Sequence, residues 1–179
     1  MKKIQFDDKT NLLLSFSLIA LAVLSRFAPH PANFAPIAAV AMFAGAVLPR
    51  KMAISVPLLA IVISDIFIGL HSLVFFTWGS FVLIALLSSK TLRRVSASGV
   101  LATSMVASVL FYLVTNFGVW AEGRLYDHSI AGLMSSYYNA LPFFRNTLLS
   151  DVVYSSILFG AYALAVQYAK SPKGLKAVD

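Results

Sequence analysis

The sequence of 179 residues contains no cysteine. Without a thiol, the chain forms no disulfide, offers no thiolate to a metal ion and has no cysteine nucleophile. Disulfide-stapled domains, thiolate metal sites and cysteine enzymes are therefore excluded before any motif is read. The same absence leaves the cellular compartment open.

Charged residues are also scarce. Asp, Glu, Lys and Arg make up 12% of the chain, whereas a soluble domain has about 25%, and hydrophobic residues make up 59% against roughly 45–50%. A chain this apolar cannot bury its hydrophobic surface in one soluble core, so we expect it to face lipid. The net charge of +7 does not indicate nucleic-acid binding, because the basic residues lie in short clusters between apolar runs.

Six apolar runs, separated by clusters of Lys, Arg, Pro or Gly, predict an all-α integral membrane protein, a six-helix bundle in one domain over residues 1–179. A helix needs about 20 predominantly apolar residues to cross the hydrocarbon core of a bilayer. The predicted spans are residues 11–26, 34–48, 52–70, 72–89, 95–120 and 141–169. A cleaved signal peptide is the alternative for the first run, because Lys2 and Lys3 precede it.

The distribution of Lys and Arg predicts the orientation, since short cytoplasmic loops carry an excess of positive residues. If the N-terminus is inside, eleven of the 14 basic residues lie on the cytoplasmic side. The three on the outer side are Arg26, Arg124 and Arg145. We therefore expect both termini in the cytoplasm.

The second run carries small residues in pairs four positions apart, a spacing that suits close packing of helices in lipid. These residues are Ala35, Ala39, Ala41 and Gly45. We expect the backbone of a neighbouring helix to approach this run closely.

The rare polar side chains gather toward the predicted outer ends of the spans. A charged residue inside the bilayer costs about 2.5–3.5 kcal/mol, so it faces the bundle interior, pairs with another charge or lines a cavity. Asp65 and Asp151 lie one to two turns inside the outer ends of the third and sixth spans. The candidate ligand-binding residues are Arg26, His30, Asn33, Asp65, His71, Trp78, Tyr112, Asn116, Trp120, Arg145, Asn146 and Asp151.

Helical spacing places several polar residues on common faces. On the fifth span a polar or aromatic residue recurs every fourth position, at Ser104, Ser108, Tyr112, Asn116 and Trp120. On the sixth span the shared face holds Thr147, Asp151, Tyr154 and Ser155. For the serines we favour helix-to-helix hydrogen bonding over ligand binding, whereas for the two acids we favour a functional role.

The connection between the last two spans, residues 121–140, is too long for a simple turn. Residues 129–140 are apolar and aromatic enough to form a short helix along the membrane interface over a cavity, with Gly132 as its weak point. An ordinary amphipathic connector is an equal alternative.

Searches for catalytic motifs are negative, and we do not expect an enzyme. The sequence has no phosphate-binding glycine loop, no paired metal-ligand histidines at helical spacing and no nucleophile elbow. Three alternatives stay open: an intramembrane enzyme with His30 or His71 as general base, a metal site formed by these histidines with Asp65, and a purely structural ion pair between Asp65 and Arg145.

Four stretches of the sequence resemble a known family. They are SRFAPHPANFAPIAAVAMFAGA (25–46), SDIFIGLHS (64–72), TNFGVW (115–120) and LPFFRNTLLSD (141–151). They resemble a bacterial family of small six-helix transporters similar to the substrate-binding S-components of energy-coupling factor (ECF) vitamin transporters. Within that group the chain most resembles the solitary cobalamin (vitamin B12) transporters of the BtuM type, over residues 11–169.

The resemblance implies a cavity that opens outward beneath the first, third and fifth loops. By position, His30, Asp65 and Arg145 match residues that the cobalamin-binding relatives place around the corrin. Those relatives use a cysteine after the third span as a cobalt ligand, and this chain has Trp78 and Gly79 in that neighbourhood. A corrinoid cobalt would then be ligated by His30 or His71, or bound without a protein ligand.

We therefore expect a transporter, or its substrate-binding component, that takes up a vitamin-like small molecule across the bacterial inner membrane. Cobalamin or another corrinoid is the expected cargo, and no intrinsic cofactor is expected. Another vitamin, a cofactor precursor or an intramembrane enzyme is the alternative. Arg145 and Asp65 would hold polar groups of the ligand, and Trp78, Tyr112 and Trp120 would stack on it.

The expected partners are the vitamin-like substrate and membrane lipid, and no nucleic acid. Because the chain has no nucleotide-binding motif, ATP-driven transport would need separate ECF-type coupling and ATPase subunits. Facilitated diffusion without partners is the other option.

Overall fold

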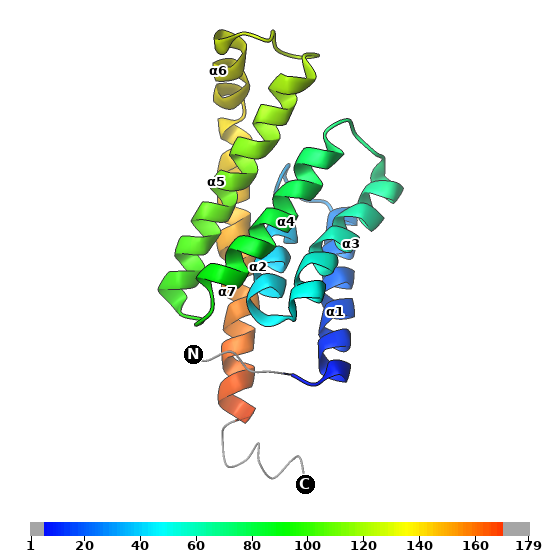
Figure 1. Cartoon of the computed structure of the whole chain (residues 1–179), viewed down its shortest axis with the longest axis vertical. Helices are drawn as coiled ribbons and strands as arrows, with labels where there is room; N and C mark the ends of the chain where they lie inside the picture. Colours follow the sequence, from blue (N-terminus) through cyan, green and yellow to red (C-terminus); the bar gives the residue numbers. More distant parts are fainter. Residues whose placement is uncertain (1–5, 170–179) are drawn as a thin grey trace.

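A computed structural model describes residues 6–169 and confirms an all-α protein, with no strand in this range. Its seven helices run mostly side by side (Figure 1). The helices are α1 Asp8–Phe27, α2 Ile37–Val47, α3 Arg50–Ile68, α4 Val74–Thr91, α5 Ala97–Glu122, α6 Ile130–Asn139 and α7 Leu141–Ala169.

Five of these helices, α1, α3, α4, α5 and α7, are long and apolar enough to cross a membrane. They correspond to five of the six predicted spans. The first helix has 20 residues, which gives about 30 Å at 1.5 Å per residue. The start of α1 is capped by Asp7, whose side chain accepts a hydrogen bond from the backbone N–H of Thr10, and this bond lowers the pKa of the Asp7 carboxyl.

The predicted span at residues 34–48 is a much shorter helix than expected. Helix α2 has 11 residues and is about 16 Å long, roughly half the thickness of the hydrocarbon core. Prolines explain both ends of this helix. Pro36 stands at its N-cap, and Pro49 follows its C-cap residue Leu48, which has the extended backbone that a following proline favours.

Helix α2 forms the centre of the bundle, and each of its 11 residues is buried. It packs against α3, α4, α5, α7 and α1. A helix that is apolar on all sides belongs inside a protein rather than at its surface. The hydrophobic core therefore lies around α2 rather than between two layers.

Helices α2 and α4 are in close contact, as the small residues of this run predict. A Cβ atom added to Gly45 would lie 2.1 Å from the carbonyl oxygen of Ala85. One turn away on each helix, the hydroxyl of Ser88 donates a 2.6 Å hydrogen bond to the carbonyl oxygen of Met42. The absence of a side chain at Gly45 lets the two backbones meet.

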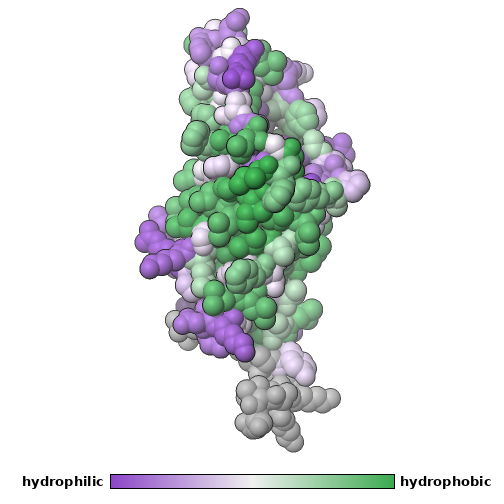
Figure 2. Space-filling view, turned by 90° about the vertical axis from the view of Figure 1, so that its right-hand side faces the viewer, coloured by the Kyte–Doolittle hydropathy of each residue, from purple (hydrophilic) through white to green (hydrophobic). Residues whose placement is uncertain are grey.

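The outer surface between the two ends of the bundle is hydrophobic, as Figure 2 shows for one face. Large apolar side chains point outward from the long helices, among them Phe16 at 68% exposure, Phe67 at 74% and Leu164 at 68%. An apolar belt between polar ends is the surface that a lipid bilayer covers. This arrangement is consistent with a multi-pass membrane protein.

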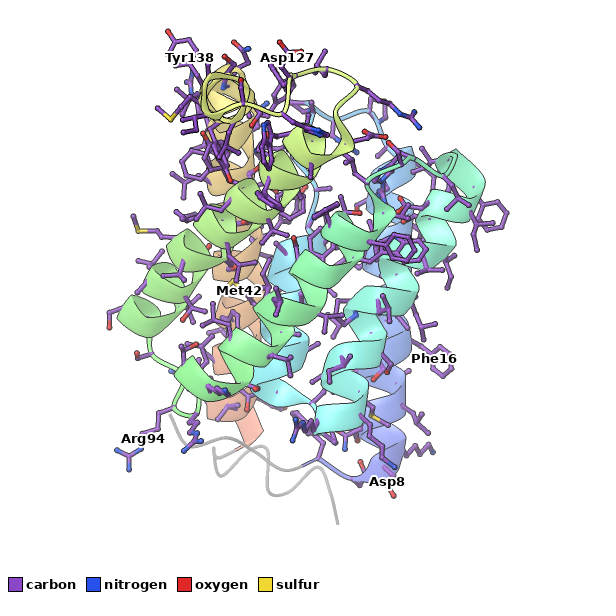
Figure 3. The ribbon with its side chains drawn as sticks, turned by 45° about the horizontal axis from the view of Figure 1, so that its top comes forward. Asp8, Phe16, Met42, Arg94, Asp127 and Tyr138 are labelled. Carbon is purple, nitrogen blue, oxygen red and sulfur yellow. The ribbon has the colours of Figure 1, made fainter. Side chains whose placement is uncertain are left out.

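The described chain begins and ends at the same end of the bundle, where α1 starts and α7 finishes (Figure 1). Figure 3 places Asp8 and Arg94 at this end and Asp127 and Tyr138 at the opposite one. The expected cytoplasmic lysines 2, 3, 170, 173 and 176 lie outside the described residues.

The predicted short helix at residues 129–140 is confirmed as α6. The side chain of Ser129 caps it by accepting a hydrogen bond from the backbone N–H of Gly132. The helix packs on α5 and α7, and the Tyr112 hydroxyl of α5 donates to the carbonyl oxygen of Tyr137 at 2.7 Å.

We expect Gly45→Ala to destabilise the protein by about 1–3 kcal/mol, because the new methyl group forces α2 and α4 apart. The matched control is Gly79→Ala on α4, where an added Cβ has no heavy atom within 4 Å. Alanine favours the helix at such a site, so the control should keep or raise the stability. Thermal unfolding in detergent, followed by circular dichroism, measures both variants. Equal stability of the two would contradict the close contact at Gly45.

Candidate functional site

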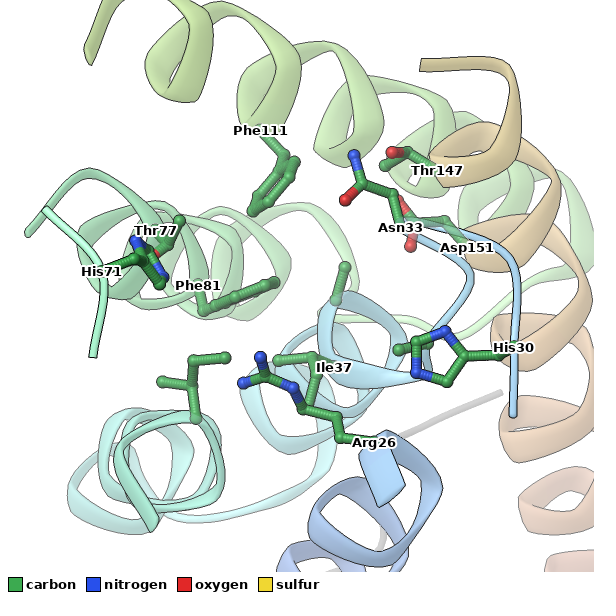
Figure 4. Close-up of a pocket in the computed structure, with 13 residues that line it drawn as sticks. Arg26, His30, Asn33, Ile37, His71, Thr77, Phe81, Phe111, Thr147 and Asp151 are labelled. Carbon is green, nitrogen blue, oxygen red and sulfur yellow. The ribbon is translucent and has the colours of Figure 1, made fainter. Parts of the chain in front are cut away.

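A cavity of about 210 Å³ lies toward the end of the bundle opposite the one where α1 begins and Arg94 lies. Its walls come from α1, α2, α3, α4, α5 and α7 and from the α1–α2 and α3–α4 loops (Figure 4). It is lined by Arg26, His30, Asn33, Ala35, Ile37, Ala38, Ile61, His71, Thr77, Phe81, Phe111, Thr147 and Asp151. Five of the predicted binding residues are thus brought together: Arg26, His30, Asn33, His71 and Asp151.

Asp65 is the centre of a polar network beside the cavity. Its carboxylate is 1% exposed, and its Oδ1 accepts a 2.6 Å hydrogen bond from Nη1 of Arg26. Its Oδ2 accepts a 2.7 Å bond from Nε1 of Trp78. Nη1 of Arg26 also donates to the hydroxyl of Ser64 at 2.9 Å. The network joins α1, α3 and α4, and the cationic Arg26 lies in the last turn of α1, where the helix dipole favours it.

The structure corrects the alternative ion pair between Asp65 and Arg145. Asp65 pairs with Arg26 instead, and Arg145 is exposed, without an ion pair to any residue of 6–169. The reason is the order of the helices. Helix α3 packs beside α1, whereas α7, which carries Arg145, has no contact with α3.

Asp151 forms a second polar point, on α7. It is 2% exposed, and its Oδ2 lies 2.6 Å from the hydroxyl of Ser108 on α5. Thr147, one turn earlier on α7, lines the same cavity. The shared face predicted for Thr147 and Asp151 is therefore confirmed, and so is the helix-to-helix hydrogen bonding expected of the α5 serines in the case of Ser108.

The two histidines lie at the mouth of the cavity, one on each loop (Figure 4). Nδ1 of His30 lies 2.9 Å from the carbonyl oxygen of Pro31. Nδ1 of His71 accepts a hydrogen bond from the backbone N–H of Leu73 at 3.2 Å, which leaves the proton of the neutral ring on Nε2. That Nε2 is 3.9 Å from Oδ2 of Asp65, beyond hydrogen-bonding distance.

The proposed metal site of His30, His71 and Asp65 does not form in the part of the chain that the structure describes. In residues 6–169 no three His, Asp or Glu side chains gather closely enough to hold a metal ion. His30 and His71 are on separate loops, and Asp65 already accepts bonds from Arg26 and Trp78.

The other predicted binding residues on α5 lie outside the lining of the cavity, and two of them, Tyr112 and Trp120, hold α6 and the loop before it. Tyr112 bonds to α6, and the side-chain amide of Asn116 donates to the Tyr112 carbonyl oxygen at 2.8 Å. Nε1 of Trp120 lies 3.1 Å from the carbonyl oxygens of Asp127 and Ser129. The polar residues that recur every fourth position on α5 thus have two roles. Ser108 faces Asp151, whereas Tyr112 and Trp120 fix the connection to α7.

Asn146 and Trp78 also have partners within the protein. The side-chain amide of Asn146 donates to the carbonyl oxygen of Ala32 at 3.0 Å and so fixes the α1–α2 loop to α7. Trp78 donates to Asp65 and packs against the hydrophobic core. Both residues support the walls of the cavity, and neither lines it.

Sequence reasoning missed Thr77, Phe81 and Phe111, which line the cavity. Thr77 and Phe81 are four residues apart, so they share a face of α4, and this spacing was a usable signal. The rings of Phe81 and Phe111 lie 5.2 Å apart between centroids, tilted by 31°. Nothing in the sequence distinguishes Phe111 from the phenylalanines that face lipid.

One family model matches the chain over residues 6–173, nearly its whole length, and its description is a family of unknown function (DUF6580). No curated protein matches the chain. No solved structure matches it either.

Replacing Arg26 by Gln leaves Asp65 buried without its cation. Removing one partner of a buried ion pair costs about 3–5 kcal/mol. Because the Arg26 side chain is 19% exposed, we expect the free energy of unfolding to fall by an amount at the lower end of this range. Arg145→Gln is the matched control and should change it by less than about 0.5 kcal/mol. Unfolding titrations in mixed detergent micelles measure the difference.

The double variant Arg26→Gln with Asp65→Asn should recover part of this loss, since it removes the unpaired charge. Equal losses from Arg26→Gln and Arg145→Gln would show that the ion pair does not hold the helices together.

Proposed function

The chain belongs to the DUF6580 family, and we propose that it is a multi-pass protein of the bacterial inner membrane that binds a small vitamin-like molecule for uptake. Five helices long enough to span a bilayer and the apolar surface between the ends of the bundle support the membrane location. Uptake proceeds either with separate energy-coupling subunits or by facilitated diffusion.

The observation that carries this proposal is the cavity itself. Most of the bundle interior is apolar, yet Arg26, His71, Thr77, Thr147 and Asp151 come together from different elements around one open volume. Apolar walls with a few convergent polar groups are the usual composition of a small-molecule site. A bundle held only by packing would gain nothing from leaving this volume unfilled.

The charge distribution supports a cavity that opens to the outside. The exposed basic residues Arg50, Lys51, Lys90, Arg93 and Arg94 flank the α2–α3 and α4–α5 turns, at the end where α1 begins and α7 finishes. The positive-inside rule assigns this end to the cytoplasm. The cavity and the loops that carry its two histidines then face the periplasm.

The size of the cavity favours a small ligand. Drug-sized ligands occupy about 300–1,000 Å³, and this cavity has about 210 Å³. A corrinoid is larger than a drug-sized molecule, so cobalamin would require the helices to move apart, with His30 or His71 as the cobalt ligand. A smaller vitamin or a cofactor precursor fits the cavity as it stands.

The arrangement supports binding rather than catalysis. In residues 6–169 neither histidine of the cavity is hydrogen-bonded to a serine, a threonine or a carboxylate, so neither is paired with a hydroxyl nucleophile as its base. The polar groups instead surround a volume in which a ligand can be held.

The orientation can be tested directly, because the chain has no native cysteine. Single cysteines are introduced as Arg94→Cys and Arg124→Cys, both at exposed positions. We expect a membrane-impermeant maleimide to label Arg124→Cys in intact spheroplasts and to label Arg94→Cys only after lysis. The opposite pattern would place the cavity on the cytoplasmic side.

Filling the cavity should abolish binding. We expect small molecules that copurify with the full chain in lipid nanodiscs, identified by native mass spectrometry, to be lost in Ala38→Phe and Thr77→Phe. Both residues line the cavity, and a phenyl ring there takes up much of its volume. The matched control Ala102→Phe lies on the exposed face of α5 and should keep the ligand.

Two positions are used because Ala38 is buried and its replacement also stresses the core. A wild-type protein that carries no ligand and shows no thermal shift with a panel of vitamins would count against the proposal. Retention of the ligand in both filled variants would show that it binds elsewhere.

A further inference from the structure

The two buried carboxylates near the cavity are satisfied to different extents. Asp65 accepts one hydrogen bond from a guanidinium and another from an indole. Asp151 lies on the opposite side of the cavity and has the hydroxyl of Ser108 within reach of one oxygen. Among residues 6–169 it has no other hydrogen-bond donor and no cationic partner.

Even the bond from Ser108 is shared. Its hydroxyl lies 2.6 Å from Oδ2 of Asp151 and 3.0 Å from the carbonyl oxygen of Ser104 on its own helix. A hydroxyl has one proton to donate, so Asp151 receives at most one hydrogen bond from the described protein. A carboxylate that is 2% exposed usually accepts several bonds or pairs with a charge.

The side chain of Asp151 faces the cavity. Asp151 is part of the cavity lining, and in Figure 4 its side chain points toward the space beside Asn33 and Thr147. The charges around the cavity are not balanced. Arg26 and Asp65 neutralise each other, so an ionised Asp151 adds one negative charge that no arginine or lysine of the lining balances.

The rest of the lining fits a flat ring. Phe81 and Phe111 present two aromatic rings, and aromatic faces attract cations as well as other rings. The side-chain amide of Asn33 can donate or accept a hydrogen bond. The hydroxyls of Thr77 and Thr147 donate their protons to carbonyl oxygens of their own helices, so toward the cavity they can accept. The lining therefore combines the carboxylate of Asp151, aromatic walls, polar groups and Arg26, whose own charge is paired with Asp65 beside the cavity.

We propose that the ligand of this cavity is a small organic cation, a flat ring that carries an amine or a protonated nitrogen, and that Asp151 is the residue that binds its charge. The cation donates a hydrogen bond to Asp151, and the ring lies against Phe81 and Phe111. This inference rests on the proposed function, since it assigns a ligand class to the same cavity.

The test uses three probes of nearly equal shape and different charge: benzylamine, benzyl alcohol and benzoate. Each is titrated at pH 7 into the full chain in lipid nanodiscs, and binding is measured by isothermal calorimetry and by the shift in unfolding temperature. We expect benzylamine to bind at least tenfold more tightly than the other two. In Asp151→Asn its affinity should fall at least tenfold, to that of benzyl alcohol.

The matched control is Asp8→Asn, the same change at an exposed acid in the first turn of α1, which should keep the preference for the amine. If Asp151→Asn does not fold, the comparison of the three probes on the wild-type protein decides. The inference is overturned if benzyl alcohol or benzoate binds as tightly as the amine, if Asp151→Asn keeps the amine preference, or if no probe binds.

Failure of this inference differs from failure of the proposed function. A neutral or anionic ligand that copurifies, is lost in Ala38→Phe and persists in Asp151→Asn would refute the cation and keep the binding function. A wild-type protein that carries no ligand, and that gives the same result as Ala38→Phe in every binding measurement, would refute both.

Discussion

The carboxylate of Asp65 is the point on which the outer half of the bundle depends. It lies on α3 and accepts bonds from Arg26 of α1 and Trp78 of α4, so one side chain fixes three helices relative to one another. In an apolar environment such a network is strong when complete and costly when one member is missing. Because Asp65 holds Arg26 in place, it also determines one wall of the cavity without lining it.

The cavity exists because α2 is short. The helices around it are 18 to 29 residues long, and α2 has 11. Its first two residues, Ile37 and Ala38, line the cavity, so the central helix begins where the open volume ends. Pro36 allows this start, and the loop before it contributes His30 and Asn33. A central helix as long as its neighbours would fill the space that the polar side chains surround.

The sequence was sufficient for what depends on local pattern. Apolar runs predicted the long helices, and helical spacing placed Thr147 and Asp151 on one inward face. It was insufficient for what depends on the order of the helices in space. From the sequence, Arg145 was considered as the partner of Asp65 and Arg26 was not, because only the packing of α3 beside α1 shows that Arg26 is the neighbour. Trp120 was expected at the ligand, yet its indole holds the loop before α6, an arrangement that no periodicity records.

The contrast between Asp65 and Asp151 links structure and function. The protein satisfies Asp65 by itself, so this acid stabilises the bundle whether or not a ligand is present. Asp151 connects α7 to α5 through one shared hydroxyl, so in the empty protein it contributes little and costs desolvation. A cation in the cavity removes that cost and contacts lining residues of α4, α5 and α7 at once. Ligand binding would then stabilise the folded bundle, by about 2.7 kcal/mol at a ligand concentration one hundred times Kd, and would do so through Asp151 rather than Asp65.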